Sequence, residues 1–81
     1  MRLGLRFDRR DATRLRAWAA RVRNGELGAE ASANTYEQAA RAAESGEPLE
    51  VYCTDPMEVV QMAALYTAHG FTRPVIEELN G

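Results

Sequence analysis

The sequence contains no lysine and only one cysteine, one histidine and one tryptophan among its 81 residues. The single cysteine, Cys53, cannot form a disulfide within the chain, and it excludes a cysteine-rich zinc site. No apolar run approaches the roughly 20 residues that span a bilayer. The N-terminal residues also lack the apolar segment of a secretory signal. We therefore expect a cytoplasmic protein that does not interact with membranes.

The residue patterns of the common catalytic sites are missing too. The sequence has no glycine-rich phosphate loop and no cluster of metal ligands. His69 lies at the expected end of a helix, where the helix dipole favours an imidazolium. Cys53 alternates inward on an expected strand and is interpreted as a small core residue. We predict that the protein is not an enzyme and holds no metal and no cofactor.

The composition is typical of one folded domain that comprises residues 1–81. Hydrophobic residues make up 46% of the chain and charged residues 27%, which argues against disorder. We find no internal repeat and no linker between domains. A chain of this length buries only a thin core, so its margin of stability is narrow.

The N-terminal third predicts a strand followed by a helix. Residues 2–7 alternate between apolar and polar positions, as in a half-buried strand. Asp8 or Asp11 is in place to cap the next helix, and Asn24 with Gly25 is suited to end it. The core-facing stripe of this helix is predicted to consist of Leu15, Trp18, Ala19 and Val22.

The rest of the chain predicts two more helices and two more strands. Residues 34–37 read Asn-Thr-Tyr-Glu and indicate a capping box for a second helix that stops at Ser45-Gly46. Residues 49–54 alternate again and predict a strand. Asp55-Pro56 opens a third helix that runs to His69, and residues 71–79 predict a last strand with Pro74 at a sheet edge.

These elements give the order β-α-α-β-α-β. We predict an α+β fold, a two-layer α/β sandwich with a small three-stranded sheet and the helices on one face. The helix between the last two strands indicates that these strands run parallel, through a right-handed crossover.

Charge is divided unevenly along the chain. Residues 1–25 hold eight arginines and two acids, a net charge of +6, whereas residues 26–81 have a net charge of -8. Helical spacing places six arginines in two rows beside a strip of small residues: Arg9, Arg16 and Arg23 in one row, and Arg10, Arg14 and Arg21 in the other. Such a surface suits a phosphate backbone or an acidic partner. The alternative is that these arginines pair with the acidic half of the same fold.

The third helix and the open sheet face are two further candidate surfaces. Val59, Val60, Ala63, Tyr66 and Thr67 are predicted to face the sheet, which leaves Met62 and Leu65 as apolar anchors on other sides. The surplus apolar surface indicates contact with neighbouring helices or with another chain. The open sheet face is expected to show Arg2, Arg6, Tyr52 and Thr54, together with Arg73.

Residues 46–70, from Gly-Glu-Pro-Leu-Glu-Val-Tyr-Cys-Thr-Asp-Pro to His69-Gly70, resemble the second half of the TusA-like sulfur-carrier family. The resemblance implies a small α/β sandwich in which a strand leads into a Thr-Asp-Pro helix start. The family accepts sulfur on a cysteine in a Cys-Pro-x-Pro element that opens its first helix. The corresponding residues here are Asp8-Arg9-Arg10-Asp11, so the reactive cysteine is not carried over and Cys53 is assigned no role.

The leading hypothesis is a small regulatory or inhibitory interaction protein. It would bind a protein partner through its charged and apolar surface, with these residues in contact: Arg9, Arg10, Arg14, Arg16, Arg21, Arg23, Met62 and Leu65. The alternatives are a nucleic-acid-binding protein that uses the arginine-rich helix, and a degenerate TusA-like carrier. A homodimer formed by a second copy of the chain is also open.

Overall fold

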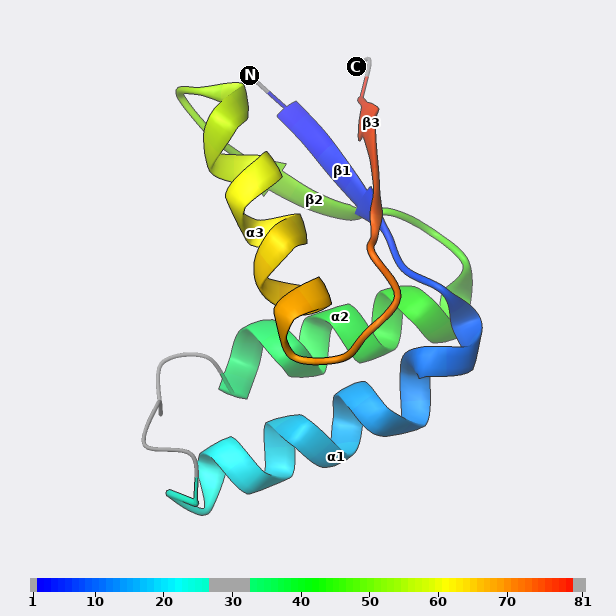
Figure 1. The fold of residues 1–81 in the computed structure, drawn as a ribbon. Helices are drawn as coiled ribbons and strands as arrows, with labels where there is room; N and C mark the ends of the chain where they lie inside the picture. Colours follow the sequence, from blue (N-terminus) through cyan, green and yellow to red (C-terminus); the bar gives the residue numbers. More distant parts are fainter. Residues whose placement is uncertain (1, 27–32, 80–81) are drawn as a thin grey trace.

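The computed structural model describes residues 2–26 and 33–79, and it has the predicted α+β fold. Helices and strands follow one another in the predicted order β-α-α-β-α-β, with a short 3-10 helix, η1, before the first α-helix (Figure 1). The elements are β1 (Arg2–Arg6), η1 (Arg9–Asp11), α1 (Ala12–Arg23), α2 (Ala33–Ser45), β2 (Leu49–Tyr52), α3 (Pro56–Ala68) and β3 (Val75–Glu78).

The sheet has the strand order β2-β1-β3, and β1 is antiparallel to both neighbours. Leu5 of β1 is the clearest marker of the register, because it stands opposite Leu49 on one side and Ile76 on the other. Strands β2 and β3 therefore run in the same direction, as predicted, but they do not pair because β1 lies between them. The edge position of β3 agrees with the proline just before it.

One face of the sheet forms the core with the helices. Leu3, Leu5 and Phe7 point to this face, as their alternation predicts, and all three are buried. Helices α1 and α2 run side by side in opposite directions, while α3 crosses beside the sheet (Figure 1). Helix α2 contributes mainly small side chains, which allow close approach of its backbone: Ala33, Ala39, Ala40, Ala42 and Ala43.

Several helix ends follow their sequence signals. The Asp55 side chain accepts a hydrogen bond from Met57 N at 3.0 Å and caps α3, with Pro56 in the first turn. Gly46 and Gly70 follow α2 and α3 with φ of 77° and 88°, a conformation that glycine adopts without strain.

Other predicted boundaries were wrong. Helix α2 begins at Ala33, so Asn34 lies inside the first turn and does not form the predicted N-cap. Strand β3 begins at Val75 because the residues from Phe71 to Pro74 form a loop. Trp18 is only half-buried, since it packs at the rim of the core.

Asp11 is the one buried charged residue among those described; it occupies the N-cap position of α1, but its side chain makes no capping hydrogen bond, whereas Asp8 caps η1. The Asp11 carboxylate accepts a hydrogen bond from Thr72 N at 2.7 Å. It also accepts one from Arg14 Nη1 at 3.3 Å. The bond from Thr72 joins the start of α1 to the loop between α3 and β3, although the two segments are far apart in the sequence. None of the described helices has the length and apolar character needed to cross a membrane.

Candidate functional site

Four of the six predicted partner-binding arginines form ion pairs within the fold. Arg16 pairs with Glu44 at 2.8 Å, and Arg23 pairs with Glu37 at 2.9 Å, both on α2. Arg23 lowers the pKa of Glu37, first through side-chain hydrogen bonds and then through its charge. The remaining two ion pairs are Arg10–Asp8 and Arg14–Asp11.

Each of the two arginine rows therefore keeps one arginine without an ion pair to a described residue. Arg9 and Arg21 are exposed, and neither forms an ion pair with any residue that the structure describes. The guanidinium of Arg21 instead lies over the indole ring of Trp18, 5.7 Å from its centroid. Neutralisation within the fold reduces the positive charge that α1 presents to a phosphate backbone.

A pocket of about 270 Å³ lies between α1 and the end of α3. Its lining is Arg14, Ala17, Trp18, Arg21, His69 and Phe71. The α1 residues of this lining recur at helical spacing, so they share one side of the helix. The pocket therefore combines two guanidinium groups with an aromatic wall, and none of its described lining residues is acidic.

The aromatic wall is built around Trp18. Its indole stacks on the His69 ring with centroids 4.9 Å apart and an interplanar angle of 24°. Phe71 meets the indole edge-on at 5.8 Å. The Tyr36 hydroxyl forms a hydrogen bond with His69 Nδ1, which fixes the imidazole ring from the core side. Burial raises the pKa of Tyr36, so this hydroxyl remains neutral at ordinary pH.

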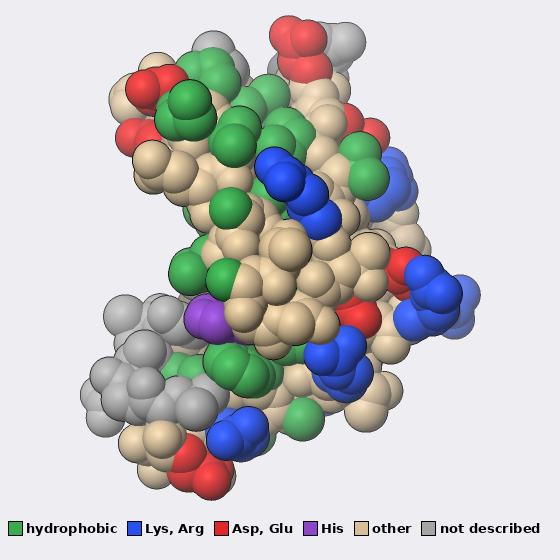
Figure 2. Space-filling view, viewed as in Figure 1, with side chains coloured by type: hydrophobic (Ala, Val, Ile, Leu, Met, Phe, Trp, Pro, Cys, Tyr) green, Lys and Arg blue, Asp and Glu red, His purple; other side chains and the backbone are tan. Residues whose placement is uncertain are grey.

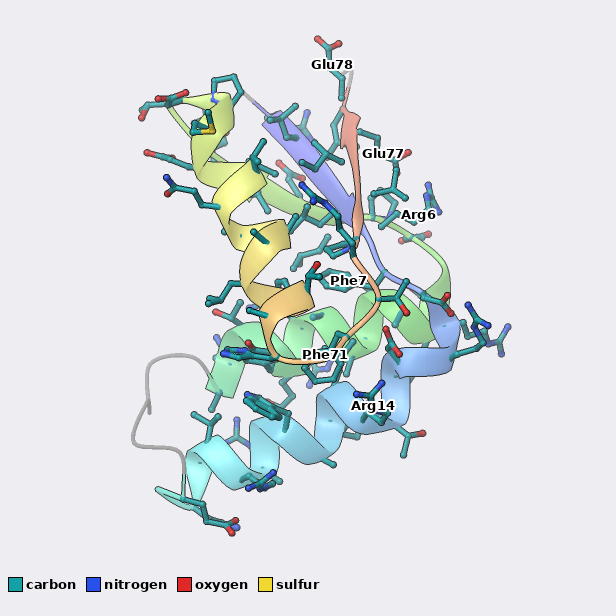
Figure 3. All side chains as sticks on the ribbon, viewed as in Figure 1. Arg6, Phe7, Arg14, Phe71, Glu77 and Glu78 are labelled. Atoms are coloured by element: carbon teal, nitrogen blue, oxygen red, sulfur yellow. The ribbon has the colours of Figure 1, made fainter. Side chains whose placement is uncertain are left out.

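Arg14 is held on the other side of the pocket by three contacts. Nη2 donates to the Gly70 carbonyl oxygen at 2.9 Å, Nη1 donates to Asp11, and the guanidinium lies 5.0 Å from the Phe71 ring centroid. Figure 3 shows Arg14 and Phe71 next to each other, where the chain leaves α3 and passes α1. An arginine fixed in this way loses little further freedom when it binds an anion.

The exposed face of α3 is apolar, but it differs from the predicted one. Val59, Ala63 and Tyr66 are buried as predicted, whereas Val60 and Thr67 are exposed rather than turned to the sheet. Met62, predicted as an exposed anchor, is half-buried against the core and offers less surface than expected. Leu65 is 52% exposed, in agreement with its predicted position.

We call the uncharged stripe on the exposed side of this helix the α3 face; Glu58 and Thr67 are exposed beside it. It consists of Met57, Val60, Gln61, Ala64, Leu65 and Ala68. None of these side chains is charged, and Met57 is 56% exposed. Leu65 stands one turn before His69, so the α3 face continues into the pocket. Figure 2 shows hydrophobic side chains along the upper left of the molecule and around the histidine, with arginines near the pocket.

The open face of the sheet is occupied by ion pairs within the chain. Arg2 pairs with Glu50 at 2.7 Å and lowers the pKa of that carboxyl, chiefly through a side-chain hydrogen bond. Arg6 pairs with Glu77 at 2.8 Å. Tyr52 is 79% exposed on this face, as predicted. Thr54 does not belong to the strand, because β2 ends at Tyr52.

The two groups that sequence reasoning excluded from catalysis have the positions expected of structural residues. Cys53 is a free, buried thiol, and His69 is the C-cap of α3. Residues 2–26 and 33–79 contain no group of three or more His, Cys, Asp or Glu side chains that could hold a metal ion.

Sequence reasoning did not predict the pocket, because it gave three of the lining residues separate structural roles. Trp18 was assigned to the core, His69 to a helix end and Phe71 to a strand. The available signal was the spacing of Arg14, Trp18 and Arg21, which places an aromatic ring between two cations on one side of a helix.

Comparisons of the chain with protein-family models, with curated proteins and with solved structures found no match. The resemblance to the TusA-like family therefore stays a prediction.

Proposed function

We propose that this protein is a non-catalytic interaction protein that binds an apolar, acid-bearing segment of another protein along the α3 face. The observation that carries the proposal is the exposure of this uncharged helix surface. A helix that only covers a sheet ordinarily has polar side chains on its outer side. Here Glu58 is the one charged residue between Pro56 and Ala68.

Burial of the exposed side chains of Met57 and Leu65 would contribute to the free energy of binding. Full burial of a Leu or Met side chain stabilises by about 1.5–3 kcal/mol. Met57 and Leu65 each keep roughly half of their surface in water. Covering both would contribute about 2 kcal/mol, to which Val60 and the exposed alanines would add.

The charges at the two ends of the α3 face favour a partner segment with an acidic residue at one end. Asp55 and Glu58 stand at the N-terminal end of α3, while Arg14 and Arg21 stand by the pocket at its C-terminal end. An apolar partner segment with an acidic residue at one end would therefore bind in one orientation, with its acid toward the arginines.

The test is photo-crosslinking from the centre of the α3 face. Gln61 is replaced by a benzophenone amino acid in the full chain, and the crosslinked peptide is identified by mass spectrometry. We expect a segment of another protein that carries apolar residues and an Asp or Glu. Leu65→Glu should abolish the crosslink, whereas Val75→Glu should preserve it, because Val75 is 61% exposed on β3 and pairs with Arg6 on the open face of the sheet.

Three outcomes would overturn the proposal. A crosslink to the chain itself would assign the α3 face to a homodimer. Nucleic acid that co-purifies and dissociates with a steep salt dependence would favour the nucleic-acid alternative. A crosslink that survives Leu65→Glu would show that the α3 face does not make the contact.

A further inference from the structure

We propose that the pocket between α1 and α3 is a binding site for a small carboxylic acid with an apolar body. The inference goes beyond the proposed function, because it concerns a free small molecule and requires no protein partner. It rests on the lining of the pocket, in which two guanidinium groups face an aromatic wall that the fold holds in place.

The charge of the site favours a monoanion. Arg14 and Arg21 bring two positive charges, but Asp11 lies 3.3 Å from Arg14 and offsets one of them. Arg21 has no carboxylate partner among the residues that the structure describes. About one positive charge is left over, which matches a carboxylate better than a phosphate monoester with its charge near -2.

Hydrogen-bond donors remain available for that carboxylate. A guanidinium has five N–H groups, and Arg14 uses one nitrogen for Gly70 and another for Asp11. The two arginines are seven residues apart on α1, and the small side chain of Ala17 lies between them in the lining. A carboxylate above Ala17 would meet donors from both sides.

The aromatic wall accounts for the apolar body. Trp18, His69 and Phe71 form a continuous wall through ring contacts of 4.9 and 5.8 Å. The volume of about 270 Å³ is slightly below the range of drug-sized ligand sites. A compact acid of benzoate size therefore fits better than a nucleotide or a long-chain fatty acid.

The indole of Trp18 offers a direct readout, because the chain has one tryptophan. Benzoate is titrated into the full chain at low salt, and the indole N–H resonance is followed by NMR together with the Phe71 amide. We expect a saturable shift of both resonances with Kd of about 1 mM, a value in the range of small fragment-like ligands. Benzamide, the neutral analogue, should bind at least tenfold more weakly, and acetate should bind more weakly than benzoate.

Arg21→Gln is the decisive variant, since Arg21 makes no ion pair with the described residues and its loss should not unfold the protein. It should weaken benzoate binding at least tenfold. Arg9→Gln is the matched control, because it removes the same charge from an exposed arginine outside the pocket, and it should change Kd less than twofold. Asp11→Asn should raise the affinity for phenyl phosphate relative to benzoate, because it leaves the site with a second uncompensated positive charge.

The proposal is overturned if benzoate gives no saturable shift, or if benzamide binds as well as benzoate. It is also overturned if Arg9→Gln and Arg21→Gln weaken binding equally, because the effect would then come from net charge alone. Leu65→Glu, which tests the α3 face, should leave the benzoate affinity within about threefold of that of the unmodified chain. Failure of the protein-binding proposal and failure of this one are therefore distinguishable.

Discussion

Replacement of Asp11 by alanine should destabilise the protein more than the loss of any exposed ion pair. The Asp11 carboxylate is buried and accepts the Thr72 N–H at 2.7 Å. A hydrogen bond to a charged group contributes about 1.5–3 kcal/mol. The contact with Arg14 adds at most about 1 kcal/mol, because the Arg14 side chain is more than half exposed. We therefore expect Asp11→Ala to lower the free energy of unfolding by about 2–4 kcal/mol.

The small size of the domain makes this effect measurable as a shift in Tm. A domain of 60–100 residues loses roughly 4–8 °C in Tm per kcal/mol, so Asp11→Ala should lower Tm by at least about 8 °C. Urea unfolding, followed by circular dichroism and by Trp18 fluorescence, measures the change. Asp11→Asn should cost less, since an amide oxygen still accepts the Thr72 N–H. Asp55→Ala, which removes an exposed helix cap, serves as a reference near 1 kcal/mol.

The result that would refute this reasoning is an Asp11→Ala variant within about 0.5 kcal/mol of the unmodified chain. In that case the bond to Thr72 would not hold the loop against α1, and the shape of the pocket would not depend on it. Equal losses for Asp11→Ala and Asp11→Asn would place the stabilisation in the charge rather than in the hydrogen bond to the loop.

Four further predictions concern single positions. The buried Tyr66 hydroxyl has no hydrogen-bond partner in the described structure, so Tyr66→Phe should be neutral or should stabilise by up to about 1 kcal/mol in urea unfolding. A Cβ at Gly4 would lie 2.8 Å from Pro48 Cβ, so Gly4→Ala should cost about 1–2 kcal/mol despite the better strand propensity of alanine. Hydrogen bonds from Arg10 lower the pKa of Asp8 from 3.8 to about 2. The stabilisation from Asp8 should thus be complete above about pH 4 and be lost as the pH falls toward 2, and an NMR titration of Arg10→Ala should return the midpoint toward 3.8. The buried Cys53 thiol should react slowly with a disulfide reagent in native protein and rapidly in urea, and equal rates would favour the sulfur-carrier alternative.

Local signals in the sequence predicted an element correctly where the local preference of its residues was the deciding influence. Alternation of Leu3, Leu5 and Phe7 predicted β1 and its buried face, and Asp55-Pro56 predicted the start of α3. Prediction was wrong where a local preference competed with a distant contact. Residues 71–74 have strand character, but Thr72 donates its N–H to Asp11 rather than to a sheet neighbour.

The residues predicted to bind a partner also show where local spacing is sufficient and where it is not. Helical spacing predicted which arginines lie on the surface of α1, because solvent exposure follows from the 3.6-residue period. It did not predict which of them are neutralised, because Glu37 and Glu44 belong to a helix whose position along α1 depends on packing. Met62 and Leu65 looked equivalent in sequence, yet only Leu65 is strongly exposed.

The sequence by itself determined the type and order of the elements, the inward direction of Cys53 and the presence of a single charged residue on α3. These properties depend on neighbours within one or two helical turns, or on alternation along a strand. Only the tertiary structure decided that β1 lies between β2 and β3. It also decided that Asp11 accepts a hydrogen bond from Thr72, which is 61 residues away in the sequence. It also brought Trp18 and His69 together in the pocket. The physical reason is that pairing and burial between distant segments depend on the free energy of the whole packed chain. A local stretch of sequence does not determine that free energy.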